Sequence, residues 1–174
     1  MIERPVLLKA DEVRLILAGR TNVIRRPFRP QPGGRFLGLL ERPIRSMQQP
    51  PVLRAWFSGG PTDRSSVEIT CPYGKPGDHL WVREAWVPDP TDDGSWNYTS
   101  WAGCKEGRIA GVPEHFRKPE HVIYAADWKH DPLAWNSGVS MPRWASRLTL
   151  EVVDVQVEQV PGKPWVWVVG LHWP

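Results

Sequence analysis

The stretch from Cys71 to Trp86, CPYGKPGDHLWVREAW, constrains the fold of this chain more than any other. It begins with a cluster of prolines and glycines that ends in Gly77-Asp78, and such a cluster is typical of a tight turn. From Leu80 onwards we expect an extended segment, in which successive side chains point to opposite faces. The stretch therefore predicts a turn that leads directly into a half-buried strand.

Glu84 is the unusual residue of this strand. One face of the strand is expected to carry Leu80, Val82, Glu84 and Trp86, and the other Trp81, Arg83, Ala85 and Val87. A carboxylate in an apolar row must be paired, hydrogen-bonded or protonated, because burying a bare charge is costly. Two interpretations stay open: a structural ion pair with a nearby arginine, which the strand alone favours, and a carboxylate at the floor of a pocket.

The rest of the chain shows short strands and turns around one helix. The 19 prolines and 15 glycines indicate many short elements. The spacing of Val13, Ile16 and Leu17 predicts a helix that begins at Ala10 and ends at Gly19. Further strands are expected at 5–8, 67–69, 121–126, 148–160 and 165–169, with one or two short strands within 28–66.

The expected strand over 148–160 changes phase part-way. Leu150 and Val152 share one face, whereas Val153 and Val155 follow the opposite alternation. A switch at Val152-Val153 predicts a bulge or bend, which lets a strand turn the corner of a barrel. The last strand is apolar on both faces and is expected to be central. We therefore predict one domain over residues 1–174, of the α+β class and mainly β: a small, partly open β-barrel with one or two flanking helices and long Trp-rich loops.

Eleven tryptophans are far more than a chain of this length ordinarily has. Tryptophan packs in cores, but it also stacks on bases and anchors interfaces. Trp96, Tyr98 and Trp101 lie in a long loop over 88–120, where they either form a lid or, in the commoner case, pin the loop to the body.

The charge pattern mildly favours an anionic partner. The formal net charge is +3, and the densest basic run extends from Arg20 to Arg29. If this run is extended, Arg25 and Arg26 point to opposite faces. The run is either solvated, as most such clusters are, or a rim that faces phosphate groups.

Several classes of protein find no support in the sequence. The two cysteines, Cys71 and Cys104, give no disulfide framework, and five scattered histidines show no metal-ligand spacing, so we expect no metal and no cofactor. The N-terminal segment MIERPVLLKADEVR is charged too early for a signal peptide, and no apolar run is long enough to span a membrane. These patterns predict a soluble cytoplasmic protein.

Three segments together resemble one family. They are ILAGR at 16–20 leading to Arg25-Arg26, GDHLWVRE at 77–84 and MPRWASR at 141–147. In this order they resemble the ASCH-domain proteins of bacteriophages and prophages, part of the PUA-like superfamily, over nearly the whole chain. The resemblance implies a β-barrel with a cleft beside the first helix. It also implies recognition of RNA or modified nucleotides, in the cytoplasm of the bacterial host.

The chain departs from this family at the residues of one catalytic branch. That branch hydrolyses the acetyl amide of acetylated cytidine with a lysine, a threonine and a glutamate. Gly19, Arg26 and Glu84 match the family pattern, but Thr21 stands at the lysine position and Ile24 at the position of threonine or glutamate. Thr21 has no amine and Ile24 has no exchangeable proton, so the mechanism should not transfer.

The leading hypothesis is a module that binds nucleic acid or a nucleotide without catalysis. The candidate contact residues, whose convergence is implied by the family cleft, are Arg25, Arg26, Trp81, Arg83, Glu84, Arg143, Trp144, Ser146 and Arg147. Arginine suits phosphate, tryptophan can stack on a base, and Glu84 can accept a hydrogen bond from a base amino group. For any single tryptophan core packing is the commoner role, and for any single arginine an ion pair is.

Two other functions stay open. One is an amidohydrolase that acts on acetylated cytidine, with Glu84 as the acid and base and with Lys9 or Lys75 replacing the missing lysine. The other is a phage protein that binds a host or virion protein, with the Trp-rich loop as its anchor.

Overall fold

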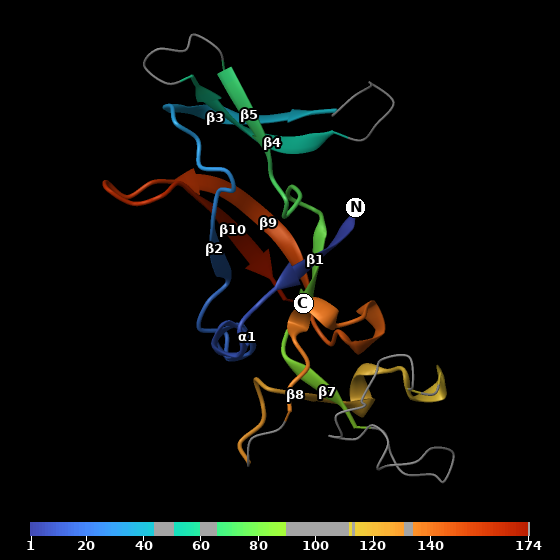
Figure 1. Ribbon diagram of the computed structural model, residues 1–174. Helices are drawn as coiled ribbons and strands as arrows, with labels where there is room; N and C mark the ends of the chain where they lie inside the picture. Colours follow the sequence, from blue (N-terminus) through green and yellow to red (C-terminus); the bar gives the residue numbers. More distant parts are fainter. Residues whose placement is uncertain (44–50, 60–65, 90–111, 113, 131–133, 174) are drawn as a thin grey trace. The chain divides into compact units, whose positions relative to one another are not determined.

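A computed structural model of the 174-residue chain describes residues 1–43, 51–59, 66–89, 112, 114–130 and 134–173. These residues form ten strands, one α-helix and several short 3-10 helices (Figure 1). The chain is therefore mainly β and of the α+β class, as the sequence predicts. The aromatic residues Trp96, Tyr98 and Trp101 of the long loop lie outside the described residues, as does Cys104.

The strands form three sheets. They are β1 (Glu3–Leu7), β2 (Val23–Pro27), β3 (Phe36–Arg42), β4 (Val52–Ser58), β5 (Ser66–Thr70), β6 (His79–Arg83), β7 (Trp86–Pro88), β8 (Val122–Tyr124), β9 (Thr149–Glu158) and β10 (Val166–His172). The first sheet has the order β1-β6-β9-β10-β2, the second the order β3-β4-β5, and the third is the β7-β8 pair. Strand β10 pairs antiparallel with β9 on one side and with β2 on the other, which confirms its predicted central position.

Contacts within the chain divide it into two compact units. Unit 1 comprises Met1–Arg4, Asn22–Leu80 and Leu150–Pro174, and unit 2 comprises Pro5–Thr21 and Trp81–Thr149. The single domain expected from the sequence stays a prediction.

Helix α1 (Ala10–Leu17) belongs to unit 2, begins at the predicted Ala10 and ends two residues before Gly19. Val13 and Ile16 form its buried stripe. Gly19 follows with a φ of 65°, a left-handed conformation that ends many helices and that glycine adopts at little cost. The prediction that Gly19 ends the helix is confirmed.

Val153 is the bulge that the change of phase predicts. Gly170 of β10 pairs with Asp154 whereas Leu171 pairs with Val152, so the register passes over Val153. Val152 is fully buried and Val155 is 5% exposed, but Val153 between them is 48% exposed. The extra residue is thus turned outward, and the strand keeps burying apolar side chains after it.

An aromatic cluster forms part of the core of unit 1. The Phe28 ring stacks on Trp167 with centroids 4.2 Å apart, and Phe57 meets Phe28 edge-on at 5.4 Å. All three side chains are buried. Because Phe57 comes from β4 and Trp167 from β10, the cluster ties the three-stranded sheet to the end of β10 within this unit.

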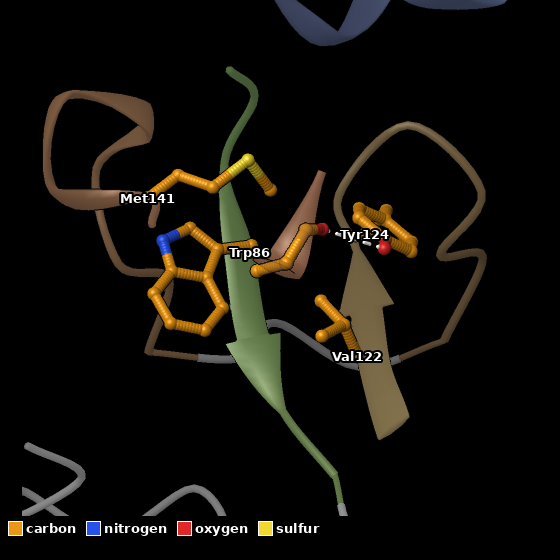
Figure 2. Close-up of a cluster of buried hydrophobic side chains, with 5 residues drawn as sticks. Trp86, Val122, Tyr124 and Met141 are labelled. Carbon is orange, nitrogen blue, oxygen red and sulfur yellow. Dashed lines mark hydrogen bonds between the residues drawn. The ribbon is translucent and has the colours of Figure 1, made fainter. Parts of the chain in front are cut away.

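A second cluster forms around the β7-β8 pair in unit 2. Figure 2 shows its residues, in which Trp86, Val122, Tyr124 and Met141 converge on one another. The Tyr124 hydroxyl donates a hydrogen bond to the carbonyl of Ala145 at 2.8 Å, whereas the buried indole nitrogen of Trp86 has no hydrogen-bond partner.

Two predicted strands are shorter than expected. The strand from Leu80 to Val87 is interrupted at Glu84-Ala85, which separates β6 from β7. The strand predicted over 121–126 is reduced to β8, because a 3-10 helix (Pro119–His121) precedes it and a turn follows it. Within the described residues, no helix is both long and apolar enough to cross a membrane.

Candidate nucleic-acid interface

Two guanidinium groups lie against the indole ring of Trp81 in unit 2. The Cζ atom of Arg83 is 5.6 Å from the ring centroid, and that of Arg143 is 5.8 Å from it. Both distances lie within the range of about 6 Å over which a cation is attracted by an aromatic face. Trp81 and Arg83 share the half-buried face of β6, and Arg143 is exposed at the start of a 3-10 helix (Arg143–Ala145). We call these three residues the Trp81 platform.

Neutral acceptors orient both arginines of the Trp81 platform. Arg83 Nε donates a hydrogen bond to the Gly138 carbonyl at 2.9 Å, and Arg143 Nη2 donates one to Thr149 Oγ1 at 3.2 Å. These two bonds help to hold the guanidinium groups beside the indole ring.

Glycine at position 138 permits the first of these bonds. A Cβ atom there would lie 2.7 Å from Leu7 Cδ1 and 3.1 Å from the Glu84 carbonyl. A side chain at position 138 would therefore require Leu7 and the Glu84 backbone to shift.

Glu84 is an ion-paired carboxylate in an apolar interior. Its side chain is 2% exposed, and it accepts hydrogen bonds from Arg147 Nε at 3.0 Å and from Arg147 Nη2 at 3.2 Å. The structure thus confirms the ion-pair interpretation and the predicted burial of Glu84. The guanidinium group of Arg147 also bonds to the carboxylate of Asp127 and lies 4.0 Å over the ring of Tyr124.

Burial and the ion pair have opposite effects on the pKa values of Glu84 and Arg147. Burial raises the pKa of the Glu84 carboxyl above its ordinary value, and the hydrogen bond from Arg147 offsets this only in part. Burial acts to lower the pKa of Arg147, but the hydrogen bonds to Glu84 and Asp127 outweigh it and raise that pKa. Arg147 therefore stays charged beside two carboxyl groups, which makes it a poor neighbour for an additional anion.

Two further candidates of the MPRWASR segment are structural in this arrangement. Ser146 is 6% exposed, and its hydroxyl donates to the carbonyl of Val82 at 2.8 Å. Trp144 is half-buried and packs edge-on against Trp86, with centroids 5.9 Å apart. Of this segment, Arg143 is the candidate whose guanidinium group lies against Trp81. Contacts of the other candidates with nucleic acid stay predictions.

Arg25 and Arg26 lie on β2 in unit 1, and their side chains go to opposite faces. Arg25 Nε is 3.5 Å from Glu158 Oε2, whereas Arg26 lines a pocket of unit 1. The alternation predicted for an extended basic run is therefore confirmed. The structure brings Trp81, Arg83 and Arg143 together in unit 2, and it joins Glu84 to Arg147 there as a separate pair.

The residues considered for catalysis in the sequence have the following surroundings in the structure. Lys75 Nζ is paired with Glu41 Oε2 at 2.8 Å, and Ile24 is 3% exposed. Lys9 is exposed just before α1, where its backbone N–H donates to Glu12 Oε2 at 2.9 Å. Among the described residues, no three His, Cys, Asp or Glu side chains come together as ligands of a metal would.

Comparison with known proteins leaves the family open. No family model, no curated protein and no solved structure matches the chain. The resemblance to ASCH-domain proteins therefore rests on the three segments of sequence alone.

Sequence reasoning missed three residues that complete the site. Gly138 and Thr149 orient the platform arginines, and Asp127 shares Arg147 with Glu84. Asp127 and Gly138 stand in irregular segments with no periodic pattern around them, so no local signal identifies their partners.

Proposed function

We propose that this chain is a PUA-like, ASCH-type phage protein that binds RNA, or another nucleic acid or modified nucleotide, without catalysis. The observation that carries the proposal is the Trp81 platform, with Arg83 and Arg143 at 5.6 and 5.8 Å from one indole ring. A base stacks on the indole, while the two guanidinium groups attract the phosphates on either side of it.

Single-stranded RNA is the form that suits such a platform. An indole ring needs the open face of an unstacked base, and unpaired nucleotides offer one. Stacking of this kind contributes about 1–3 kcal/mol per base and tolerates any base, because every base has a π-face. The platform therefore supports binding with little preference for sequence.

The surroundings of Glu84 favour binding over amide hydrolysis. Both of its carboxylate oxygens already accept hydrogen bonds from Arg147. A general base must instead reach the proton that it abstracts, directly or through one water. We therefore assign Glu84 the role of positioning Arg147.

The barrel and the phage origin are part of the same proposal. The bulge at Val153 and the two-sided pairing of β10 support a sheet that curls towards closure. The segments 16–20, 77–84 and 141–147 support the ASCH assignment and, with it, a place in the cytoplasm of the bacterial host.

The experiment is a binding titration at low salt. The fluorescence anisotropy of a labelled single-stranded RNA of mixed sequence is measured against the protein and against two variants. Trp81→Ala should weaken binding by on the order of tenfold, because one stacked base is lost. Trp173→Ala removes a 47% exposed tryptophan elsewhere and should leave the affinity within about twofold.

Two results would count against the proposal. One is that Trp81→Ala and Trp173→Ala bind the RNA with equal affinity, while equal urea midpoints show that both variants are equally stable. The other is no association with single-stranded RNA or duplex DNA at low salt, which would favour a protein partner instead.

A further inference from the structure

Unit 1 contains a pocket that is lined by two arginines and two hydroxyl-bearing residues. Its volume is about 440 Å³, within the range of about 300–1,000 Å³ that is common for sites of small ligands. Its polar wall is formed by Arg26, Arg29, Thr70 and Tyr73. The charged residues among the described lining are the two arginines.

The alternation of β2 is what sends Arg26 to this pocket. Arg25 points to the other face of the strand, where its Nε lies 3.5 Å from Glu158 Oε2. Arg26 Nη1 is in turn held by the carbonyl of Arg25 at 3.0 Å. Two adjacent arginines of one basic run thus have different surroundings, and only the second lines the pocket.

A braced turn holds Tyr73 at the pocket wall. Asp78 is 4% exposed, and its carboxylate accepts hydrogen bonds from the N–H groups of Ile2 at 2.9 Å and Lys75 at 3.2 Å. The Asp78 carbonyl accepts a further bond from the Val152 N–H at 2.8 Å. The turn that carries Tyr73 is therefore fixed at its end to β9 and to the N-terminal segment.

Tyr73 stays neutral in this position. Burial raises the pKa of its phenol, although Arg26 and Arg29 are near enough to act in the opposite direction. The hydroxyl can therefore donate a hydrogen bond to an anion between the two guanidinium groups.

The remaining wall is apolar. Ile69 of β5 and Trp167 contribute to it. Trp167 is 2% exposed and stacked on Phe28 with the ring planes at 22°, so it forms a rigid surface and not a mobile one. A ligand that combines an anion with an apolar or aromatic part matches both walls.

We propose that this pocket binds a nucleotide through a terminal phosphate, with Arg26 and Arg29 on the phosphate and the base or sugar against Ile69 and Trp167. A phosphomonoester carries about −1.5 to −2 charges at pH 7 and offers three acceptor oxygens, which two guanidinium groups and a phenol can satisfy. An internal phosphodiester carries a single charge and offers two free acceptor oxygens, one fewer than the monoester. The site goes beyond the Trp81 platform, because a mononucleotide can occupy it whether or not a strand binds elsewhere.

Calorimetric titration of the full chain tests the ligand class. AMP and CMP should bind at least about tenfold more tightly than adenosine and than 3′,5′-cyclic AMP, since charged hydrogen bonds contribute about 1.5–3 kcal/mol each. Equal affinities for AMP, adenosine and cyclic AMP, or no heat with any of them, would overturn the proposal.

Variants place the ligand in the pocket. Arg26→Ala and Arg29→Ala should each weaken AMP binding by about tenfold or more, and Tyr73→Phe by a smaller factor. Arg25→Ala is the matched control, because it removes the same charge from the opposite face of the same strand and should change AMP affinity by less than about twofold. A loss with Arg25→Ala as large as that with Arg29→Ala would show that the effect is one of net charge, and would overturn the site.

Phosphorylated strands then identify the source of the phosphate. Short RNAs with a 5′-phosphate, with a 3′-phosphate and with neither are compared with AMP. Tighter binding of a phosphorylated strand than of AMP, lost in Arg29→Ala, supports recognition of strand ends. Tighter binding of AMP supports a free nucleotide as the ligand. Strand binding that ignores terminal phosphates, together with no binding of AMP, contradicts the site.

Discussion

Both carboxylate oxygens of Glu84 accept hydrogen bonds from one guanidinium group, that of Arg147, at 3.0 and 3.2 Å. The two residues are separated by 63 positions in the chain, and the pair holds the segment after β6 against the segment before β9 within unit 2. The Glu84 side chain is 2% exposed and that of Arg147 is 20% exposed, so water screens the interaction little.

Arg147→Leu should destabilise the protein by about 3 kcal/mol, because it leaves the Glu84 carboxylate buried without its donor. The free energy of unfolding from urea titration measures this. Lys118→Leu is the control: its partner Glu120 is 3.7 Å away, and the two side chains are 59% and 66% exposed. Loss of this exposed pair should lower the free energy of unfolding by less than about 1 kcal/mol. Similar costs for the two variants would show that the buried pair adds nothing to stability.

Stability should also depend on pH through Glu84. Burial raises the pKa of its carboxyl, so the folded chain binds this proton more tightly than the unfolded chain does. The contribution of Glu84 to the free energy of unfolding is therefore largest below its unfolded pKa of about 4.3 and decreases as the pH rises through the folded pKa. Urea titrations of the wild type and Glu84→Gln from pH 4 to 7 should show the wild-type advantage shrinking with rising pH. An advantage that grows over this range would mean that Arg147 outweighs burial.

Gly74→Ala should disrupt the turn that carries Tyr73. Gly74 has a φ of 86°, and a Cβ atom there would lie 2.6 Å from Asp78 Oδ2. A strained backbone of this kind costs about 1–3 kcal/mol, which a lower urea midpoint would reveal. Gly33→Ala is the matched control, since a Cβ atom at that position meets nothing within 4 Å. Equal midpoints for the two variants would refute this account of the turn.

Acetylated cytidine should not be hydrolysed by this chain. Position 21 is a threonine without an amine, and Ile24 is 3% exposed and has no exchangeable proton. Release of acetate from acetylated cytidine, followed by chromatography, measures the activity. Turnover that is well above background and lost in Glu84→Gln would support an enzyme in place of a binding module.

Local patterns predicted much of this structure. The stripe ending before Gly19, the phase change at Val153 and the burial of Glu84 were each readable from a few neighbouring residues, because each follows from helical or strand periodicity. The bounds of β8 could not be predicted in this way, because the 3-10 helix and the turn that shorten it leave no periodic signal in the sequence.

Long-range pairing set the limit of sequence reasoning at the site. The position of Glu84 on an apolar strand face predicted that it has a partner, but no local feature distinguished Arg147 from the other arginines. Arg147 was instead grouped with Arg143 as a phosphate contact, although the two lie four positions apart and have different partners. Which arginine pairs and which lines a surface depends on residues such as Asp127 and Thr149 that are distant or unpatterned.

The salt dependence of single-stranded RNA affinity tests nucleic-acid binding by the Trp81 platform most directly. Each phosphate contact releases counterions, so the logarithm of affinity should fall with the logarithm of salt concentration by about 0.7 per contact. With Arg83 and Arg143 as contacts the slope should be about −1.4 or steeper, and Arg143→Ala should flatten it by about 0.7. Lys163→Ala, which removes the same charge from the connection between β9 and β10, should keep the wild-type slope. An affinity that does not change with salt, or an Arg143→Ala slope equal to that of the wild type, would contradict the account.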